Sequence, residues 1–403
     1  MRIKIALFIT FAYFGAFAES TDSLYFRAES LLNTGDIAQA EAIAKKATEF
    51  YKGNGDETML AKTYFLLGYI DDERNYLANA AIYYLEAIKL KADDYTRLSC
   101  LKNLGRIFKA YNRTEDAEQY YLEALKVAAG YSQKEEAGIL YNLGNLYKEV
   151  KNFDQAKEAY LKAYTISLEA KDYVRLANLT NQIGLVFKEL KDYPSAREYY
   201  FRMINAEEQL QEAYPKFAGR AWHNIAITHL EEGNYQEAVN GCLTSLKWKE
   251  KTGKDQFITW LDLGDAYLRS GKREEALKAW STALAAMGPN LNDPDQFIIY
   301  RHLATAYEND LEQFKTYSNR YAVAWEQYHI TSEQLTDLDQ SYRFHITLEK
   351  YWQQQREKEQ FQMWLALVAG LVIIFGLILA IIYLARRRMR AQLETKLNHI
   401  LKD

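Results

Sequence analysis

Few side chains in this chain of 403 residues could do chemistry, and they are scattered. It contains six His and two Cys. The segment HLEEG at His229 is not a zinc-binding HExxH helix, because Gly233 stands where the second His is needed. His223 and His229 do not share one helical face, and neither a phosphate-binding glycine loop nor a nucleophile elbow is present. The sequence therefore predicts a non-enzymatic protein with no catalytic residue, no metal site and no cofactor.

The composition predicts helices through most of the chain. Only four Pro occur: Pro194 is expected at a helix start, and Pro215, Pro289 and Pro294 are expected in loops. A formal net charge of −4 gives no overall attraction to nucleic acid. Two Cys are too few for a disulfide framework or a structural zinc site, and Cys100 and Cys242 are expected to be packed structural residues.

The best-patterned stretch runs over residues 136–167 and reads EAGILYNLGNLYKEVKNFDQAKEAYLKAYTIS. It predicts two amphipathic helices joined at KNF, with Leu140, Leu143 and Tyr147 on one face of the first. Gly144 lies inside that helix, where it costs about 1 kcal/mol relative to Ala. We expect it to be a point of close packing between the two helices.

The same register recurs along the chain at nearly regular intervals. The packing residue is Gly68, Gly105, Gly144, Gly184 or Gly264, with Ala28, Ala226 and Ala304 in equivalent places. An Ala of the second helix follows at a constant spacing, at Ala40, Ala80, Ala117, Ala156, Ala196, Ala238 and Ala276. One helical turn after that Ala come the rings Tyr84, Tyr121, Tyr160, Tyr200 and Trp280. These coincident spacings predict a repeat architecture.

At these residues the chain resembles the tetratricopeptide repeat (TPR) family, most closely in YNLGNLYKEVKNFDQAKEAYLKAY and in WLDLGDAYLRSGKREEALKAWSTAL from Trp260 to Leu284. The resemblance implies an all-α superhelical solenoid of about seven or eight helical hairpins, which we expect over residues 19–329. The intervals exceed the 34 residues of the family repeat, so we expect helices lengthened by about a turn.

In this family, residues of the first helices that avoid the packing stripe line a concave groove that holds peptides. Here those positions are polar with a cationic bias, which favours an acidic peptide or a terminal carboxylate. The same side chains are also ordinary solvated residues on helix surfaces, and the sequence leaves both interpretations open. The candidate groove residues are Lys102, Arg106, Lys109, Tyr141, Asn145, Lys148, Asn178, Asn181, Lys188, Arg220 and His223.

The C-terminal part changes character. Residues 330–363 predict a long juxtamembrane helix, either a self-associating coiled coil or a solvated spacer. Residues 364–385 carry no charge and predict a single transmembrane helix, and residues 386–403 form a short basic tail. Small residues paired at Ala366 with Gly370, and at Gly376 with Ala380, would permit a homodimer through these helices.

Residues 1–18 have basic Arg2 and Lys4, an apolar run and Ala16-Phe17-Ala18, which is typical of a signal peptide cleaved before Glu19. Together with the Arg cluster after the span, this predicts a single-pass membrane protein with a cytoplasmic C-terminus. The repeats would lie outside the cytoplasm, in the periplasm if the chain is bacterial.

This layout resembles the sensory half of membrane-bound TPR regulators of bacteria, without their kinase or DNA-binding output domain. We therefore expect a receptor or adaptor that binds a protein or peptide in its groove and signals through a cytoplasmic partner. A static scaffold for an envelope or secretion complex and a non-catalytic subunit of an enzyme complex are the alternatives.

Overall fold

The computed structural model describes residues 23–252, 256–287, 294–307, 310–330 and 333–400. Within these ranges the regular structure is helical and contains no strand. The expected signal peptide and the expected loop at Pro289 lie outside the described residues. By chain contacts the molecule divides into two units, Met1–Ser341 and Tyr342–Asp403.

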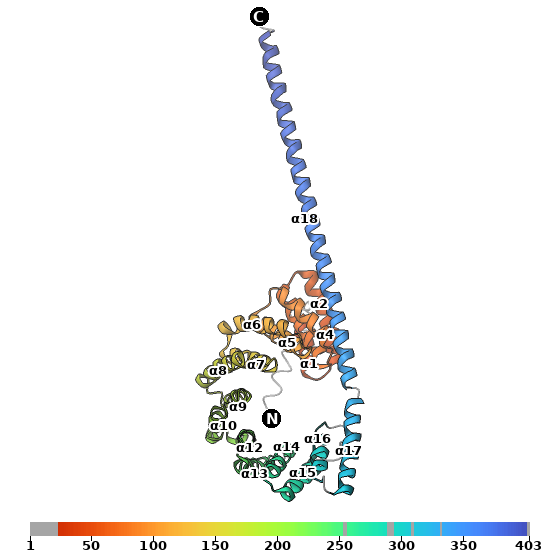
Figure 1. The fold of residues 1–403 in the computed structure, drawn as a ribbon. Coiled ribbons are helices and arrows are strands. Elements are labelled where there is room, and N and C mark those ends of the chain that lie inside the picture. The colour runs from red at the N-terminus through yellow and green to blue at the C-terminus, as the bar shows by residue number, and fades with distance from the viewer. Residues whose placement is uncertain (1–22, 253–255, 288–293, 308–309, 331–332, 401–403) are drawn as a thin grey trace, which may run out of the picture. The chain divides into compact units, whose positions relative to one another are not determined.

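The first unit contains eight helical pairs among its described residues, stacked in chain order (Figure 1). They are α1 (Ser23–Asn33) with α2 (Ile37–Asn54), α3 (Glu57–Glu73) with α4 (Leu77–Lys89), α5 (Asp94–Ala110) with α6 (Thr114–Tyr131), α7 (Gln133–Glu149) with α8 (Phe153–Glu169), α9 (Tyr173–Glu189) with α10 (Tyr193–Ile204), α12 (Tyr214–Glu232) with α13 (Tyr235–Glu250), α14 (Phe257–Arg269) with α15 (Arg273–Met287), and α16 (Pro294–Ala306) with α17 (Leu311–Ile330). The expected all-α solenoid of seven or eight hairpins is confirmed.

In five of the described pairs, the repeating contact is a glycine of the first helix against a ring of the second. A Cβ atom added at Gly144 would lie 2.4 Å from Cε1 of Tyr160, and one added at Gly264 would lie 2.2 Å from Nε1 of Trp280. Real Cβ atoms do not approach so closely, so only glycine leaves room for the ring beside the first helix. The predicted packing role of these glycines is confirmed.

The sixth pair keeps this contact with different residues. Ala226 stands in the glycine position, and Cys242 stands where five other pairs have the ring. Gly241 supplies the missing space, since a Cβ there would lie 2.8 Å from that of Ala226. Cys242 is 1 % exposed and Cys100 is fully buried, as expected for packed residues. Burial raises the pKa of both thiols, because a thiolate would lose its hydration there.

In the first seven pairs, the turn lies about two helical turns after the packing position and has a residue with positive φ. Asn112, Lys151 and Gly233 are three residues that adopt it. The second helix then begins with a polar cap in several pairs; the Asp192 carboxylate, for example, accepts a hydrogen bond from the Ser195 amide at 3.2 Å.

Two expectations about where helices begin are wrong. Pro215 lies in the first turn of α12 and Pro294 begins α16, whereas both were expected in loops. Proline fits the first turn because the amide it lacks has no partner there. The long interval from Gly184 to Ala226 comes from a short insertion, α11 (Glu207–Leu210) with the 3₁₀ turn η1 (Gln211–Ala213), and α10 has only 12 residues. Lengthened helices do not explain it.

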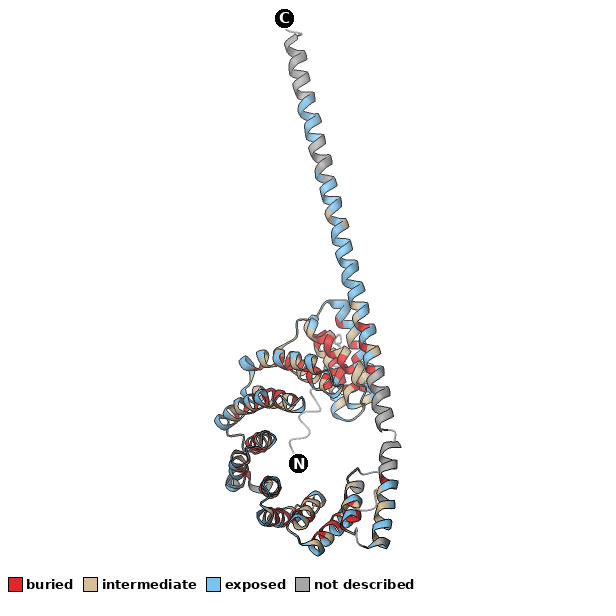
Figure 2. Ribbon diagram, viewed as in Figure 1, coloured by how far each residue is buried: buried red, intermediate tan, exposed pale blue. Residues whose placement is uncertain are grey.

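The core runs along the array where helices meet, as Figure 2 shows by the buried residues of each pair. Its largest fully buried side chains include Trp280, Tyr84 and Tyr160.

The last helix, α18 (Glu333–Ile400), has 68 residues and supplies most of the second unit. Within it, Arg343–Phe375 is long and apolar enough to cross a membrane on length and composition, and none of its most apolar window is buried. Large apolar side chains such as Leu367, Ile373 and Phe375 are exposed along it.

Candidate functional site

The first helices of successive pairs lie side by side on the inner side of the array, as α7 and α9 do relative to α8 and α10 (Figure 1). Their positions outside the glycine stripe make up what we call the inner surface. Two direct contacts between first helices are the Lys102–Glu135 ion pair at 2.5 Å and the Lys109–Glu149 ion pair at 2.7 Å.

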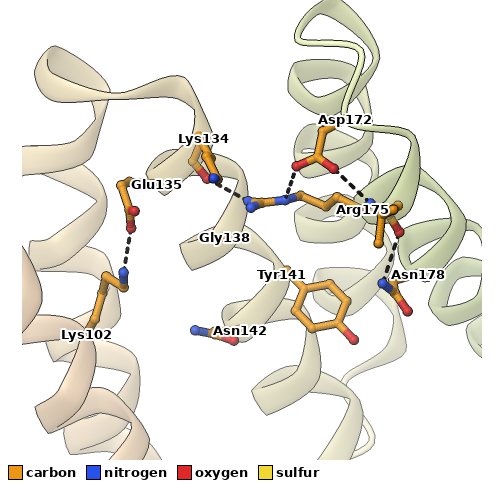
Figure 3. Close-up of a pocket in the computed structure, with 10 residues that line it drawn as sticks. Lys102, Lys134, Glu135, Gly138, Tyr141, Asn142, Asp172, Arg175 and Asn178 are labelled. Carbon is orange, nitrogen blue, oxygen red and sulfur yellow. Dashed lines mark hydrogen bonds and ion pairs between the residues drawn. The ribbon is translucent and has the colours of Figure 1, made fainter. Parts of the chain in front are cut away.

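A cavity of about 560 Å³ opens on the inner surface where α5, α7 and α9 meet (Figure 3). We call it the cationic cavity. Three cations and two carboxylates line it, together with polar and small residues. Its lining residues are Lys102, Lys134, Glu135, Gly138, Tyr141, Asn142, Asp172, Val174, Arg175 and Asn178.

Arg175 joins the two helices on one side of the cavity. Its Nε lies 3.2 Å from the Asp172 carboxylate, and its Nη1 donates to the carbonyl of Lys134 at 2.6 Å. A Cβ atom at Gly138 would lie 3.2 Å from that same Nη1, so the small residue leaves room for the guanidinium. Figure 3 shows the side chain extended between α9 and α7.

Lys134 is the one cation of the cavity whose charge is not paired with a carboxylate among the described ion pairs. Lys102 is paired with Glu135, and Arg175 is paired with Asp172. The exposed Lys134 ammonium has no acidic partner among the described ion pairs. A cavity with one unpaired cation, two further cations and several amide or hydroxyl groups suits an acidic group.

Three of the eleven sequence-predicted residues line this cavity: Lys102, Tyr141 and Asn178. Lys148 is near but outside it, and its ammonium donates to Gln182 at 2.7 Å. Burial lowers the pKa of Lys148, because the ammonium is partly removed from water. Gln182 also donates to the Tyr141 hydroxyl at 3.3 Å.

Two predicted groove residues make structural contacts. Asn145 accepts a hydrogen bond from the buried Tyr160 hydroxyl at 2.7 Å. In the next unit Leu185 replaces this Asn, and the buried Tyr200 hydroxyl has no hydrogen-bond partner among the described residues. Asn181 is only 5 % exposed and accepts from Asn224 at 2.7 Å.

The other five predicted residues form contacts with neighbouring first helices or with the helix turn beside them. Arg106 pairs with Asp72, and Lys109 with Glu149. Lys188 lies 3.6 Å from Glu231 and 3.2 Å from Glu189. Arg220 donates to Asn178 at 3.4 Å, and His223 lies 2.6 Å from Asp262. Peptide binding by all eleven residues stays a prediction.

Sequence reasoning missed Lys134, Glu135, Asp172 and Arg175. A signal was present in the last two: Asp172 caps α9, accepting from the Arg175 amide at 3.1 Å, which places Arg175 in the first turn. The contact of Arg175 with Lys134, which lies in the preceding repeat, had no local signal. No group of three or more His, Cys, Asp or Glu suited to a metal occurs in the part of the chain that the structure describes.

Repeated helical pairs with a polar inner surface define an α-solenoid of the kind that binds other proteins. Models described as tetratricopeptide repeat match residues 22–46, 61–94, 135–209 and 217–288, which is just over half of the chain. The chain belongs to the tetratricopeptide repeat family, a family of protein–protein interaction modules. No curated protein matches its sequence.

Solved structures with a similar fold include the apo form of RapI, with a TM-score of 0.58, 14 % identity and coverage of 82 % of this chain and 98 % of that one. A second is the apo form of the quorum sensor NprR from B. thuringiensis, with a TM-score of 0.52, 15 % identity and coverage of 82 % and 98 %. A third is a signal transduction ATPase with a tetratricopeptide repeat sensor from Pyrococcus horikoshii, with a TM-score of 0.56 and 12 % identity. It is matched over 81 % of this chain and 50 % of that one.

Proposed function

We propose that this protein is a non-enzymatic, membrane-anchored receptor or adaptor that binds an acidic peptide segment, or a chain-terminal carboxylate, on its inner surface. The cationic cavity carries the proposal, because Lys134 offers an unneutralised ammonium beside the Arg175 guanidinium. Proteins with this fold include one named as a quorum sensor and one named as carrying a sensor array, so sensing is compatible with the architecture.

The proposed anchor is the expected span at residues 364–385. Its support is the apolar, exposed character of the described side chains there and the cluster Arg386, Arg387, Arg388 and Arg390 directly after it. In the proposed topology the repeats lie outside the cytoplasm and the tail lies inside. A cytoplasmic partner would receive the signal, and a homodimer through α18 would transmit it.

Photo-crosslinking in cells tests the binding proposal. A photoreactive amino acid at Asn142, inside the cavity, should capture a protein or peptide, whereas the same amino acid at Lys162 on the second helix α8 should not. Adding Lys134→Glu should reduce the captured amount about tenfold, because one attractive charge becomes repulsive. Equal capture from both positions, or capture unaffected by Lys134→Glu, would contradict the proposed site.

The second candidate function is a static scaffold, which the inter-repeat ion pairs favour because they stiffen the array. Replacing residues 364–403 with an unrelated single-span anchor separates the two. A receptor should keep its crosslinked ligand and fail to complement a deletion strain, whereas a scaffold should complement it fully.

A further inference from the structure

A second cavity, of about 530 Å³, lies on the inner surface among α1, α3 and α5, and we call it the aromatic cavity. Five rings and three carboxylates line it, and Lys62 is the one cation among its lining residues. The rings are Tyr25, Phe26, Phe65, Tyr95 and Tyr131, and the carboxylates are Glu29, Asp93 and Asp94. Its charge is therefore opposite to that of the cationic cavity.

The two cavities occupy the same place in the repeat, two units apart. Counted back from the packing residue of each first helix, Tyr25 corresponds to Lys102, both three residues before it. In the same way Phe65 corresponds to Tyr141, Asp93 to Asp172, and Tyr95 to Val174. Equivalent positions of the repeat thus line both cavities, but the side chains at those positions differ.

The walls of the aromatic cavity are rings in edge-to-face pairs. The centroids of Tyr25 and Phe26 are 5.3 Å apart, and those of Phe65 and Tyr95 are 6.3 Å apart. Phe26 is 55 % exposed and Tyr95 is 58 % exposed, which is a large solvent-exposed aromatic area. Ring faces of this kind attract ammonium and guanidinium groups.

Two of the three carboxylates are available for a cation. Asp93 caps the Thr96 amide at 2.8 Å and pairs with Lys62 at 3.1 Å. Among the described contacts, the Glu29 carboxylate accepts one hydrogen bond, from the Tyr25 hydroxyl at 2.9 Å. Asp94 lies exposed in the first turn of α5, and the described ion pairs give it no cation.

We propose that the aromatic cavity binds the side chain of an Arg or Lys in the same peptide whose acidic group enters the cationic cavity. This proposal rests on the proposed function and specifies its ligand as a peptide with two charges of opposite sign. The cavities are centred on α3 and α7, two first helices apart. At about 10 Å per packed helix this is about 20 Å, or about six residues of extended chain.

The test uses the full-length protein in nanodiscs of phosphatidylcholine, a lipid without net charge. The probes are decapeptide pools with acetylated and amidated ends and a net-neutral dye. Each pool has Arg, Lys or Gln at one fixed position and Glu six residues away. One set places Glu C-terminal to that position, and the other places it N-terminal. The Arg and Lys pools should bind about tenfold more tightly than the Gln pools in fluorescence polarisation.

The variant pair Glu29→Gln with Asp94→Asn should abolish this tenfold preference while leaving the Glu-dependent binding in place. A matched control, Glu115→Gln with Glu274→Gln, removes two exposed carboxylates from the second helices α6 and α15 and should keep the preference. Tyr95→Ala, at an exposed ring, should reduce the preference without removing any charge.

The outcomes separate the two proposals. Glu-dependent binding with no gain from Arg or Lys, or a gain that survives Glu29→Gln with Asp94→Asn, overturns the aromatic cavity as a cation site and leaves the proposed function standing. No binding of any pool to the wild type overturns both the aromatic cavity as a cation site and the binding of an acidic peptide segment in the cationic cavity. A parallel set with a free N-terminal amine in place of the fixed Arg distinguishes the sources: binding equal to the Arg pools assigns the cavity to a chain terminus and contradicts the side-chain proposal.

Discussion

Gly144 has no room for a methyl group, because the Tyr160 ring occupies the space where a Cβ would lie. The same contact recurs between Gly68 and Tyr84 and between Gly184 and Tyr200. A glycine inside a helix costs stability, so its value here comes from the ring that it allows to pack.

The first prediction concerns Gly144→Ala. The added methyl group meets a fully buried ring, and we expect the free energy of unfolding to fall by about 1–3 kcal/mol. Gly130→Ala is the matched control, since no described atom beyond its own helix lies within 4 Å of the place its Cβ would take, and alanine favours the helix. Urea unfolding followed by circular dichroism measures both.

A compensating change sharpens this prediction. Gly144→Ala with Tyr160→Cys imitates the natural Ala226 and Cys242 pair and should relieve the clash, at the cost of the lost ring. If Gly144→Ala is as harmless as Gly130→Ala, the ring contact does not determine the residue at this position.

At the scale of elements, neighbouring first helices are joined by polar contacts, and α14 is the clearest case. Asp262 lies 2.6 Å from His223 of α12, and Asp265 lies 3.2 Å from His302 of α16. The second contact is close without hydrogen-bond geometry, and Oδ1 of Asp265 has no hydrogen-bond partner in the described part of the chain. Burial, followed by the neighbouring Asp262 carboxylate, raises the pKa of Asp265 from 3.8 to about 6.

The second prediction follows from this raised pKa. The folded protein binds the Asp265 proton more tightly than the unfolded chain, so its stabilising contribution is present below about pH 4 and is lost as the pH rises through 6. Asp265→Asn stays neutral. It should therefore be more stable than wild type at pH 8, by on the order of 1–3 kcal/mol, and close to wild type at about pH 3.5, where Asp265 is mostly protonated in both the folded and the unfolded state.

His302 has the opposite pH dependence in wild type and in Asp265→Asn. Burial lowers the pKa of His302, so its contribution to the free energy of unfolding is lost as the pH falls below 6.5. The difference between variant and wild type is therefore the quantity to measure, by urea unfolding at the two pH values. Asp154→Asn, at a side chain 89 % exposed, is the control and should change little at either pH. A loss of stability in Asp265→Asn at pH 8 would show that the ionised carboxylate is a needed partner of His302.

At the scale of the whole molecule, the two units have different surfaces. The array buries its apolar residues between helices, whereas α18 exposes Leu371, Val372, Ile374 and Leu377. An exposed apolar stretch of this length is suited to lipid. This contrast underlies the proposed anchor.

The third prediction is a membrane topology. Removing residues 364–403 should release the array into the soluble fraction, and the full chain should resist carbonate extraction. Protease added outside intact spheroplasts should digest the array and spare an epitope after Asp403, because the Arg cluster holds that end in the cytoplasm. A protected array and a digested epitope would reverse the topology.

The sequence by itself determined the repeat, the helical pairs and the role of the stripe glycines as packing points, whereas the structure showed that a ring of the second helix fills the space beside each of them. The first three follow from the constant spacing of packing residue, Ala and ring inside one hairpin, where local helix geometry fixes which side chains meet. It also predicted Lys102, Tyr141 and Asn178 on the inner surface, because the packing stripe defines the opposite face.

Only the tertiary structure decided which inner-surface residues are available to a ligand. Arg175 reaches the Lys134 carbonyl, Asn181 is buried against Asn224, and Arg106 is paired with Asp72. These contacts join residues in different repeats, and their geometry depends on how successive hairpins stack. No spacing within a single repeat encodes that stacking, so the two cavities and their opposite charges emerge only when the array is assembled.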